Sequence, residues 1–544
     1  MTTGRGSAVV GAGIFLSRVA GLGREMVAGR VIGLGGPADA LATALRIPNL
    51  LQNLLGEGVL SASFVPVYSG LLEIGDEREA SRIAGAIGAL LMVVTGLAVL
   101  TIVVAARPLT RLLAWGLQGE TFELAVEFTR ISAVGVGFLV MSAWCLGILN
   151  SHRAFFLPYA APVVWNAAQI VALLLAWLGD WSVADAARGL AVGATVGGAL
   201  QLAVQFPTTR RLARGLRLAF DNHHPGVRDV RRRFGPAVLG RGAVQFSAYL
   251  DLFLASFLAA GAVAALFKAQ ILYTLPVSLF AMSVAAAELP ELSRLGGDPT
   301  EIAHRANAAL RRIAFWMLGA SFPLIAAGEQ LVRLLFQGGE FTGADTSLVW
   351  LILVFYGLGL PAVGLSRMLQ NTAWALGDTA GPARLAGLRV AIGAALGLLF
   401  MFPLDRAFIG PDGVQGLVDA ITVTGPLDPM VRAERSVVRL GAVGLAIGSC
   451  IGAWIELLML ARLLDRRLPA LRSPAAALVP PGVAAAAGFV VTAFAKLVGG
   501  DLPALLAVGL TAGIGGFTYV VVAFRTGVRE SEMILRPIRR AIWR

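Results

Sequence analysis

The chain has 544 residues, of which 57% are hydrophobic and only 14% are charged, and its formal net charge is +12. Soluble domains carry about 25% charged residues, so this composition excludes an ordinary soluble protein and favours one that folds in lipid. The excess charge is almost wholly arginine, a residue that collects in the cytoplasmic loops of membrane proteins, so we expect no nucleic-acid partner.

Apolar runs long enough to cross a hydrocarbon core of about 30 Å recur from one end of the chain to the other. Hydropathy and turn residues predict an all-α integral membrane protein with about fourteen transmembrane helices. They are expected over residues 8–33, 38–70, 83–105, 123–149, 159–178, 184–206, 235–259, 262–290, 309–328, 346–371, 381–403, 438–463, 477–498 and 503–525. The first run carries arginines that a cleaved signal peptide does not tolerate, so we predict a retained, unusually polar first helix.

The distribution of arginine predicts the orientation of the chain, because cytoplasmic loops are enriched in basic residues. Arginines follow the sixth, eighth and twelfth predicted helices and the last one; they include Arg210, Arg211, Arg231, Arg294, Arg311, Arg466 and Arg529. The connection after the eleventh helix is an exception, with Arg406, Arg432, Arg435 and Arg439. We therefore expect both termini in the cytoplasm, and an even number of spans agrees with this orientation.

A weak internal echo suggests two halves. The segment 45–48, followed by Val65-Pro66, is similar to the segment 272–276, followed by Leu289-Pro290. Chance similarity is the alternative explanation. If the echo is a repeat, two six-helix units that both begin in the cytoplasm would be parallel repeats. The predicted domains are an N-lobe over 8–206, a basic cytoplasmic linker over 207–234, a C-lobe over 235–463, two additional helices over 477–525 and a basic cytoplasmic tail over 526–544.

A stripe of polar residues follows the second predicted helix. It consists of Asp39, Arg46, Asn49, Asn53 and Glu57. At 100° per residue these positions fall within a narrow sector of one helix face, and they span about 27 Å of rise. An ionisable group at membrane depth costs at least about 2.5 kcal/mol, so it is a functional candidate by default.

The first predicted helix adds Arg18, Arg24, Glu25 and Arg30 to this polar region. One interpretation is that these charges neutralise each other where two helices meet. The other is an aqueous cavity with a cationic lining that binds an anionic headgroup, because the planar guanidinium of arginine suits phosphate and pyrophosphate. Later in the chain, Lys268 either contributes to such a cavity or forms a structural pair with Asp251.

Motifs for catalysis and for metal binding are missing from the sequence. We find no glycine-rich ATPase loop, no metal-binding spacing of His or Cys, and no paired-carboxylate or Ser/His/Asp motif. The sequence therefore indicates a transporter rather than an enzyme, without a bound cofactor or metal. The energy for transport is expected to come from a coupling cation, the membrane potential or the gradient of the substrate.

Several motifs resemble those of the MurJ/MviN family. They are the run Leu16-Ser17-Arg18-Val19-Ala20-Gly21-Leu22-Gly23-Arg24-Glu25, then Ala38-Asp39-Ala40, Ile47-Pro48-Asn49-Leu50-Leu51, Gly56-Glu57-Gly58, Ser63-Phe64-Val65-Pro66 and Phe336-Gln337-Gly338-Gly339-Glu340-Phe341-Thr342. Their order and spacing hold across nearly the whole chain, and the first seventy or so residues are the most specific.

The resemblance implies a transporter of the multidrug/oligosaccharidyl-lipid/polysaccharide exporter superfamily, with two six-helix lobes around a central cavity and two extra C-terminal helices. Its substrate would be lipid II, the undecaprenyl-pyrophosphate-linked peptidoglycan precursor. Alternating access would move this lipid from the inner to the outer leaflet of the bacterial cytoplasmic membrane. Arg18, Arg24 and Asp39 match cavity positions of the family. The implied partners are lipid II, membrane lipids and proteins of cell-wall synthesis.

The chain also departs from the family pattern. Gln52 and Ile271 stand where many members have arginine, and Lys268 is a candidate substitute. Asp251 matches one ligand of a sodium site found in some members, whereas the eleventh helix has glycine near the other expected positions. Asp251 is therefore a candidate ion ligand, and sodium coupling is in doubt. The remaining alternatives are export of another polyprenyl-linked glycan or of an amphipathic drug, and a non-transporting scaffold for cell-wall synthesis.

Overall fold

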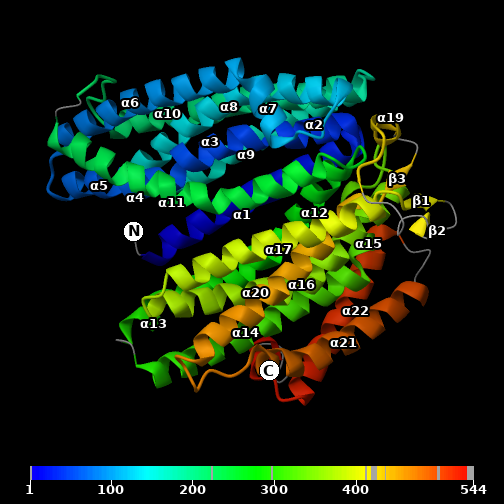
Figure 1. Ribbon diagram of the computed structural model, residues 1–544. Helices are drawn as coiled ribbons and strands as arrows, with labels where there is room; N and C mark the ends of the chain where they lie inside the picture. Colours follow the sequence, from blue (N-terminus) through cyan, green and yellow to red (C-terminus); the bar gives the residue numbers. More distant parts are fainter. Residues whose placement is uncertain are drawn as a thin grey trace. The chain divides into compact units, whose positions relative to one another are not determined.

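The computed structural model describes residues 3–221, 224–295, 298–410, 413–417, 425–434, 437–498 and 503–535, with the side chains of 3–9, 236–237, 239–248 and 504 excepted. These residues are almost entirely α-helical, with one small antiparallel sheet (Figure 1). The chain forms two compact units. Unit 1 comprises Met1–Val263 and Gly338–Phe341, and unit 2 comprises Ala264–Gln337 and Thr342–Arg544.

Unit 1 contains the helices from α1 to α11. They are α1 (Thr3–Ile32), α2 (Gly36–Ala44), α3 (Arg46–Leu55), α4 (Glu57–Ser63), α5 (Val65–Glu73), α6 (Glu77–Val104), α7 (Ala106–Leu113), α8 (Gly119–Ser151), α9 (Phe156–Leu178), α10 (Val183–Leu212) and α11 (Pro225–Ala255). Aromatic side chains centre the core, where Phe64, Tyr68 and Trp144 are fully buried. The indole of Trp144 donates a hydrogen bond to the Ala84 carbonyl at 3.2 Å, so its buried N–H is satisfied.

Unit 2 contains the later helices and the sheet. The helices are α12 (Ala262–Pro276), the π-helix η1 (Val277–Met282), α13 (Ser283–Arg294), α14 (Pro299–Ala326), α15 (Gly328–Phe336), α16 (Gly343–Ala375), α17 (Ala380–Leu404), α19 (Pro429–Ala433), α20 (Gly441–Asp465), α21 (Pro474–Val498), α22 (Ala504–Arg525) and the 3₁₀ turn η2 (Arg529–Ser531). The strands are β1 (Phe408–Gly410), β2 (Gly413–Gln415) and β3 (Val438–Arg439) in the order β2-β1-β3. Hydropathy indicates only a polar connection here, because strands of two or three residues carry no periodic signal.

The membrane-spanning character of the chain is confirmed. Within the described ranges, 12 helices or helix series are long and apolar enough to cross a membrane, and each overlaps a predicted span. The two other predicted spans correspond to α1, with 30 residues, and α11, with 31 residues. Both carry several arginines, which lower the hydropathy of any window that includes them. The predicted all-α membrane fold is therefore correct.

The second predicted helix, over 38–70, is the broken series α2 to α5. Pro48 and Pro66 lie in the first turns of α3 and α5, where a missing N–H costs nothing, so the series is broken close to both prolines. A further break lies at Gly56, where an added Cβ would be 2.2 Å from the Gln52 carbonyl oxygen. Only glycine fits that approach.

The compact units divide the chain at a different place from the predicted lobes. α11 packs on α3 and α4, so unit 1 extends to Val263, whereas the sequence assigns residues 235–463 to a C-lobe. Units defined by contacts need not coincide with halves defined by a sequence repeat, and the two lobes remain a prediction. Residues 536–544 of the predicted cytoplasmic tail lie outside the described residues.

Glycines allow α17 and α20 to pack at very close range in unit 2. A Cβ on Gly448 would lie 2.5 Å from both the Gly393 carbonyl oxygen and the Gly397 nitrogen. Such a separation is below any real Cβ contact, so the two backbones touch directly, as in membrane helix pairs built on small residues. The glycines of the eleventh predicted helix therefore have a packing role.

Candidate functional site

Arg24 is held inside unit 1 by residues of α1 and α9. Its Nη2 lies 2.5 Å from Oε1 of Glu25, and its Nη1 donates to Oε1 of Gln169 at 3.5 Å. The guanidinium also stands over the ring of Trp165, with its carbon 5.0 Å from the ring centroid. The side chain is 16% exposed, so Arg24 is a partly dehydrated cation with a fixed orientation. An arginine in this state binds an anion more strongly than one in water does.

Polar residues of α9 form the wall against which Arg24 rests. Asn166 and Gln169 are buried, and each donates its amide to the carbonyl one turn earlier, on Pro162 and Trp165 respectively. These bonds leave the side-chain carbonyls directed away from the backbone of α9. Oδ1 of Asn166 lies 3.7 Å from the position of a Cβ on Gly21 and has no hydrogen-bond partner among the described residues. Hydropathy alone does not indicate these residues, although amides in an apolar run are visible in the sequence.

Asp39 is buried at the start of α2 and has a partner in the backbone. Its Oδ2 accepts the N–H of Gly261 at 2.6 Å, in the turn that follows α11. Gly261 has φ +95°, a conformation that favours glycine. The carboxylate thus fixes the end of α11 to the first turn of α2, where a negative charge also complements the helix dipole.

The other predicted stripe residues lie on separate short helices. Arg46 and Asn53 are partly buried on α3, whereas Asn49 on α3 and Glu57 on α4 are exposed. The Arg46 carbonyl accepts the Tyr249 hydroxyl at 3.0 Å. Because α2, α3 and α4 are separate helices, a straight-helix projection does not place the stripe on one uniform face. On α1, Arg18 and Arg30 are exposed.

Lys268 and Asp251 belong to different units. Lys268 is buried on α12, with its ammonium 4.8 Å from the ring centroid of Phe336. This cation–π contact stabilises the buried charge. One turn along the same helix, the ring of Tyr273 lies 5.0 Å from that of Tyr356, centroid to centroid. Asp251 is partly buried on α11 in unit 1 and remains a candidate ion ligand.

A buried acidic residue of unit 2 was missed by the sequence analysis. Glu456 on α20 is 1% exposed and accepts hydrogen bonds from Gln370 of α16 at 2.9 Å and from Arg389 of α17 at 3.2 Å. Arg367 in turn donates to Oε1 of Gln370 at 3.2 Å. An ionisable group at membrane depth is a functional candidate, and this rule, which pointed to the first two predicted helices, applies equally to a lone glutamate in an apolar run. We name these four residues the Glu456 network.

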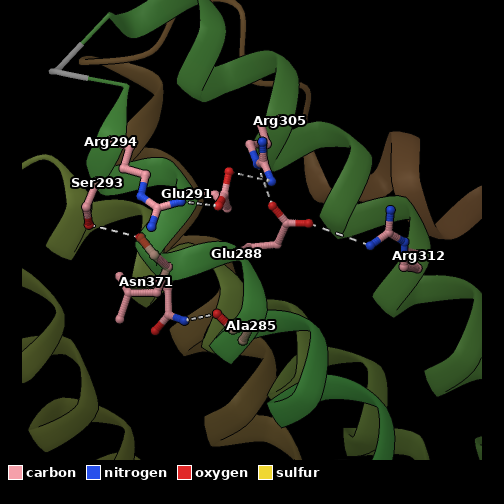
Figure 2. A network of polar contacts seen from close by, with 9 residues as sticks. Ala285, Glu288, Glu291, Ser293, Arg294, Arg305, Arg312 and Asn371 are labelled. Carbon is pink, nitrogen blue, oxygen red and sulfur yellow. Dashed lines mark hydrogen bonds and ion pairs between the residues drawn. The ribbon is translucent and has the colours of Figure 1, made fainter. Parts of the chain in front are cut away.

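A second ionic network of unit 2 lies where α13 meets α14 (Figure 2). Glu288 stands between two arginines of α14, with Oε2 2.6 Å from Nε of Arg305 and Oε1 3.6 Å from Nη1 of Arg312. Glu291 also contacts Arg305, at 3.5 Å, and pairs with Arg294 at 2.8 Å. The Glu288 side chain is only 11% exposed, so this carboxylate is the centre of the network.

Replacing Glu288 with glutamine is expected to destabilise unit 2 by about 1–2 kcal/mol, because two arginines lose their shared charged acceptor. The arginine side chains are 39% and 40% exposed, so solvent screening keeps the effect this small. Thermal unfolding of the purified protein in detergent would show a lower transition temperature. Glu291→Gln, a change at a more exposed carboxylate, is expected to have a smaller effect. If the parent and the Glu288→Gln protein were equally stable, the proposed contribution of this network to the stability of unit 2 would be contradicted.

The chain matches the family model described as "Lipid II flippase MurJ" over residues 29–411. It is 31% identical to "Probable lipid II flippase MurJ" of Rhizobium tropici, covering 76% of this chain and 78% of that protein. It is also 31% identical to "Lipid II flippase MurJ" of Burkholderia cenocepacia, covering 76% of this chain and 80% of that protein.

Solved structures share the fold of this chain. "Lipid II flippase MurJ, inward closed conformation" matches with a TM-score of 0.71 and 21% identity, over 95% of this chain and 98% of that one. The inward-facing form of a multidrug resistance MATE family transporter of the MOP superfamily matches with a TM-score of 0.61 and 17% identity, over 84% of this chain and 95% of that one. The described residues contain no group of three His, Cys, Asp or Glu side chains able to hold a metal ion.

Proposed function

This chain belongs to the lipid II flippase MurJ family, and on that premise we propose that it is a lipid II flippase. It carries the undecaprenyl-pyrophosphate-linked peptidoglycan precursor from the inner to the outer leaflet of the bacterial cytoplasmic membrane by alternating access. The single observation behind this proposal is the family match, which spans residues 29–411 and therefore includes Asp39, Arg46 and Lys268. The twelve candidate membrane spans agree with a multi-pass membrane protein.

We assign Arg24 as the residue that engages the pyrophosphate. Its guanidinium is held by Glu25, Gln169 and the face of Trp165, so little side-chain entropy remains to be lost on binding. Guanidinium groups form paired, charge-assisted hydrogen bonds with phosphate oxygens. Arg18, which is exposed on the same helix, is the candidate for first contact with the headgroup.

We propose that transport uses no bound cofactor and draws on the membrane potential or a coupling cation. Both termini are assigned to the cytoplasm from the arginine distribution.

Gly393 and Gly397 offer no side-chain oxygen and pack against Gly448, which argues against a sodium site that uses these positions. Collapsing the potential with an ionophore in cells that depend on this chain is expected to stop flipping, whereas removal of sodium at constant potential is not.

Complementation tests the proposed function directly. The resident lipid II flippase of a bacterial host would be depleted while this chain is expressed, with its membrane level followed by immunoblot. Restored growth and restored appearance of lipid II in the outer leaflet are the expected results. A well-expressed chain that restores neither would contradict the substrate assignment.

Another polyprenyl-linked glycan is the second candidate substrate. Gln52 and Ile271 occupy positions where many members of the family have arginine, so this chain lacks two expected cationic groups. A competition experiment with purified polyprenyl-linked glycans would distinguish the two, since a lipid II flippase is expected to bind lipid II more tightly than a glycolipid without the peptide.

A further inference from the structure

Glu456 lies in the interior of unit 2, and both of its carboxylate oxygens have partners. Oε1 accepts from Nε2 of Gln370 at 2.9 Å and Oε2 accepts from Nη1 of Arg389 at 3.2 Å. Its side chain has no exposed surface, and a charge so deeply buried is stabilised by a partner of opposite sign. Arg389 supplies that charge from a neighbouring helix. Glu456 and Arg389 alone would form a complete structural ion pair.

The Glu456 network carries more positive charge than such a pair needs. Arg367 donates through Nη1 to Oε1 of Gln370 at 3.2 Å, so Gln370 joins the second arginine to the same carboxylate. Two guanidinium groups thus share one carboxylate, which leaves one positive charge in excess within the network. Since an unbalanced charge at membrane depth is costly, it is a candidate for a functional role.

The two arginines are partly exposed, whereas the carboxylate is not. The Arg389 side chain is 33% exposed and Arg367 is partly buried. Each guanidinium has five N–H donors in a fixed plane, and the contacts above use one nitrogen of each. Tyr273 packs on Tyr356 in the same unit, with ring centroids 5.0 Å apart.

We propose that Arg367 and Arg389 form a second cationic subsite, in unit 2, for an anionic group on the headgroup of the transported lipid. Gln370 and Glu456 each accept from one nitrogen of a guanidinium and so orient it, while the Glu456 carboxylate also competes with an incoming anion for Arg389. The proposal rests on the proposed function, since it assumes that the chain transports a lipid with an anionic headgroup. The pyrophosphate and the carboxylates of the peptide share the chemistry that the subsite recognises.

Binding to the purified full-length protein in nanodiscs tests the subsite. The two probes are lipid II and undecaprenyl pyrophosphate, which lacks the sugar and the peptide. Arg367→Gln is expected to weaken binding about tenfold, the size of one lost charge-assisted hydrogen bond. Glu456→Gln removes the competing carboxylate and is expected to tighten binding several-fold. The double variant Arg389→Gln/Glu456→Gln leaves no unpaired carboxylate. It is expected to bind the probes about tenfold more weakly than the Glu456→Gln variant does.

Arg384→Gln is the matched control, because Arg384 is an exposed arginine on the same helix, α17. Its affinity is expected to equal that of the parent. Thermal unfolding of each variant checks the fold. Arg367→Gln leaves the Glu456–Arg389 pair intact, so it can be measured even where Glu456→Gln does not fold.

The outcomes separate the subsite from the proposed function. Weaker binding of both probes by Arg367→Gln identifies the pyrophosphate as the group bound, and weaker binding of lipid II alone identifies a peptide carboxylate. If the Arg367→Gln and Glu456→Gln proteins fold and bind both probes with the parental affinity, the subsite proposal is overturned. In that case, a loss of binding by the Arg24→Ala protein would leave the flippase assignment standing. A parent chain that binds neither probe would overturn both proposals.

Discussion

Replacing Arg24 with alanine is expected to abolish rescue of flippase-depleted cells at an unchanged membrane level of the protein. The substitution removes the guanidinium that Glu25, Gln169 and Trp165 hold in place. Each charge-assisted hydrogen bond to a phosphate is worth about 1.5–3 kcal/mol, so the loss of a bonded pair lowers affinity for the headgroup by about 100-fold or more. Plating efficiency after depletion, together with an immunoblot of the membrane fraction, would measure the effect.

Two further variants define the role of Arg24 more closely. Arg24→Lys keeps the charge but loses the planar fork, so we expect partial rescue at best. Arg78→Ala is the matched control, since Arg78 is an exposed arginine at the start of α6. Full rescue by Arg24→Ala at the parental protein level would show that this arginine does not engage the substrate. A fall in protein level would instead indicate that its contacts with α9 support the fold.

Replacing Gly448 with leucine is expected to separate α17 from α20 and to destabilise the protein by about 3 kcal/mol or more. A Cβ at this position would already lie 2.5 Å from backbone atoms of Gly393 and Gly397, so the clash cannot be relieved by a side-chain rotation. The whole helix must move. The Arg389–Glu456 contact joins the same two helices, so the shift would disturb that ion pair as well. A lower unfolding temperature and a reduced yield of folded protein in detergent are the expected measurements.

Gly387 provides the control for this substitution. It lies on α17, and no atom would come within 4 Å of a Cβ placed there. Gly387→Ala is therefore expected to be neutral or to stabilise the helix by up to about 1 kcal/mol, since alanine has the higher helix propensity. A Gly448→Leu protein as stable as Gly387→Ala would refute the close approach of α17 and α20.

The membrane fold could be predicted because lipid imposes a simple rule on sequence. Each span must be apolar over about twenty residues, and such a stretch can be identified in the sequence without knowledge of the neighbouring helices. The same rule identified Arg24 and Asp39 as exceptions. Applied to α20, it would also have identified Glu456, which stands alone in an apolar run. The small sheet carried no comparable signal, since its strands have only two or three residues.

By itself, the sequence determined that this is a helical membrane protein of the lipid II flippase family, and it predicted a functional region from charges at membrane depth. Only the tertiary structure decided which groups meet. Arg24 reaches Gln169, 145 residues away, and Asp39 reaches Gly261, 222 residues away. Helix periodicity gives the face on which a residue lies, but it does not give the helix that this face meets. That choice depends on packing between helices, which arises from long-range contacts that no local pattern encodes.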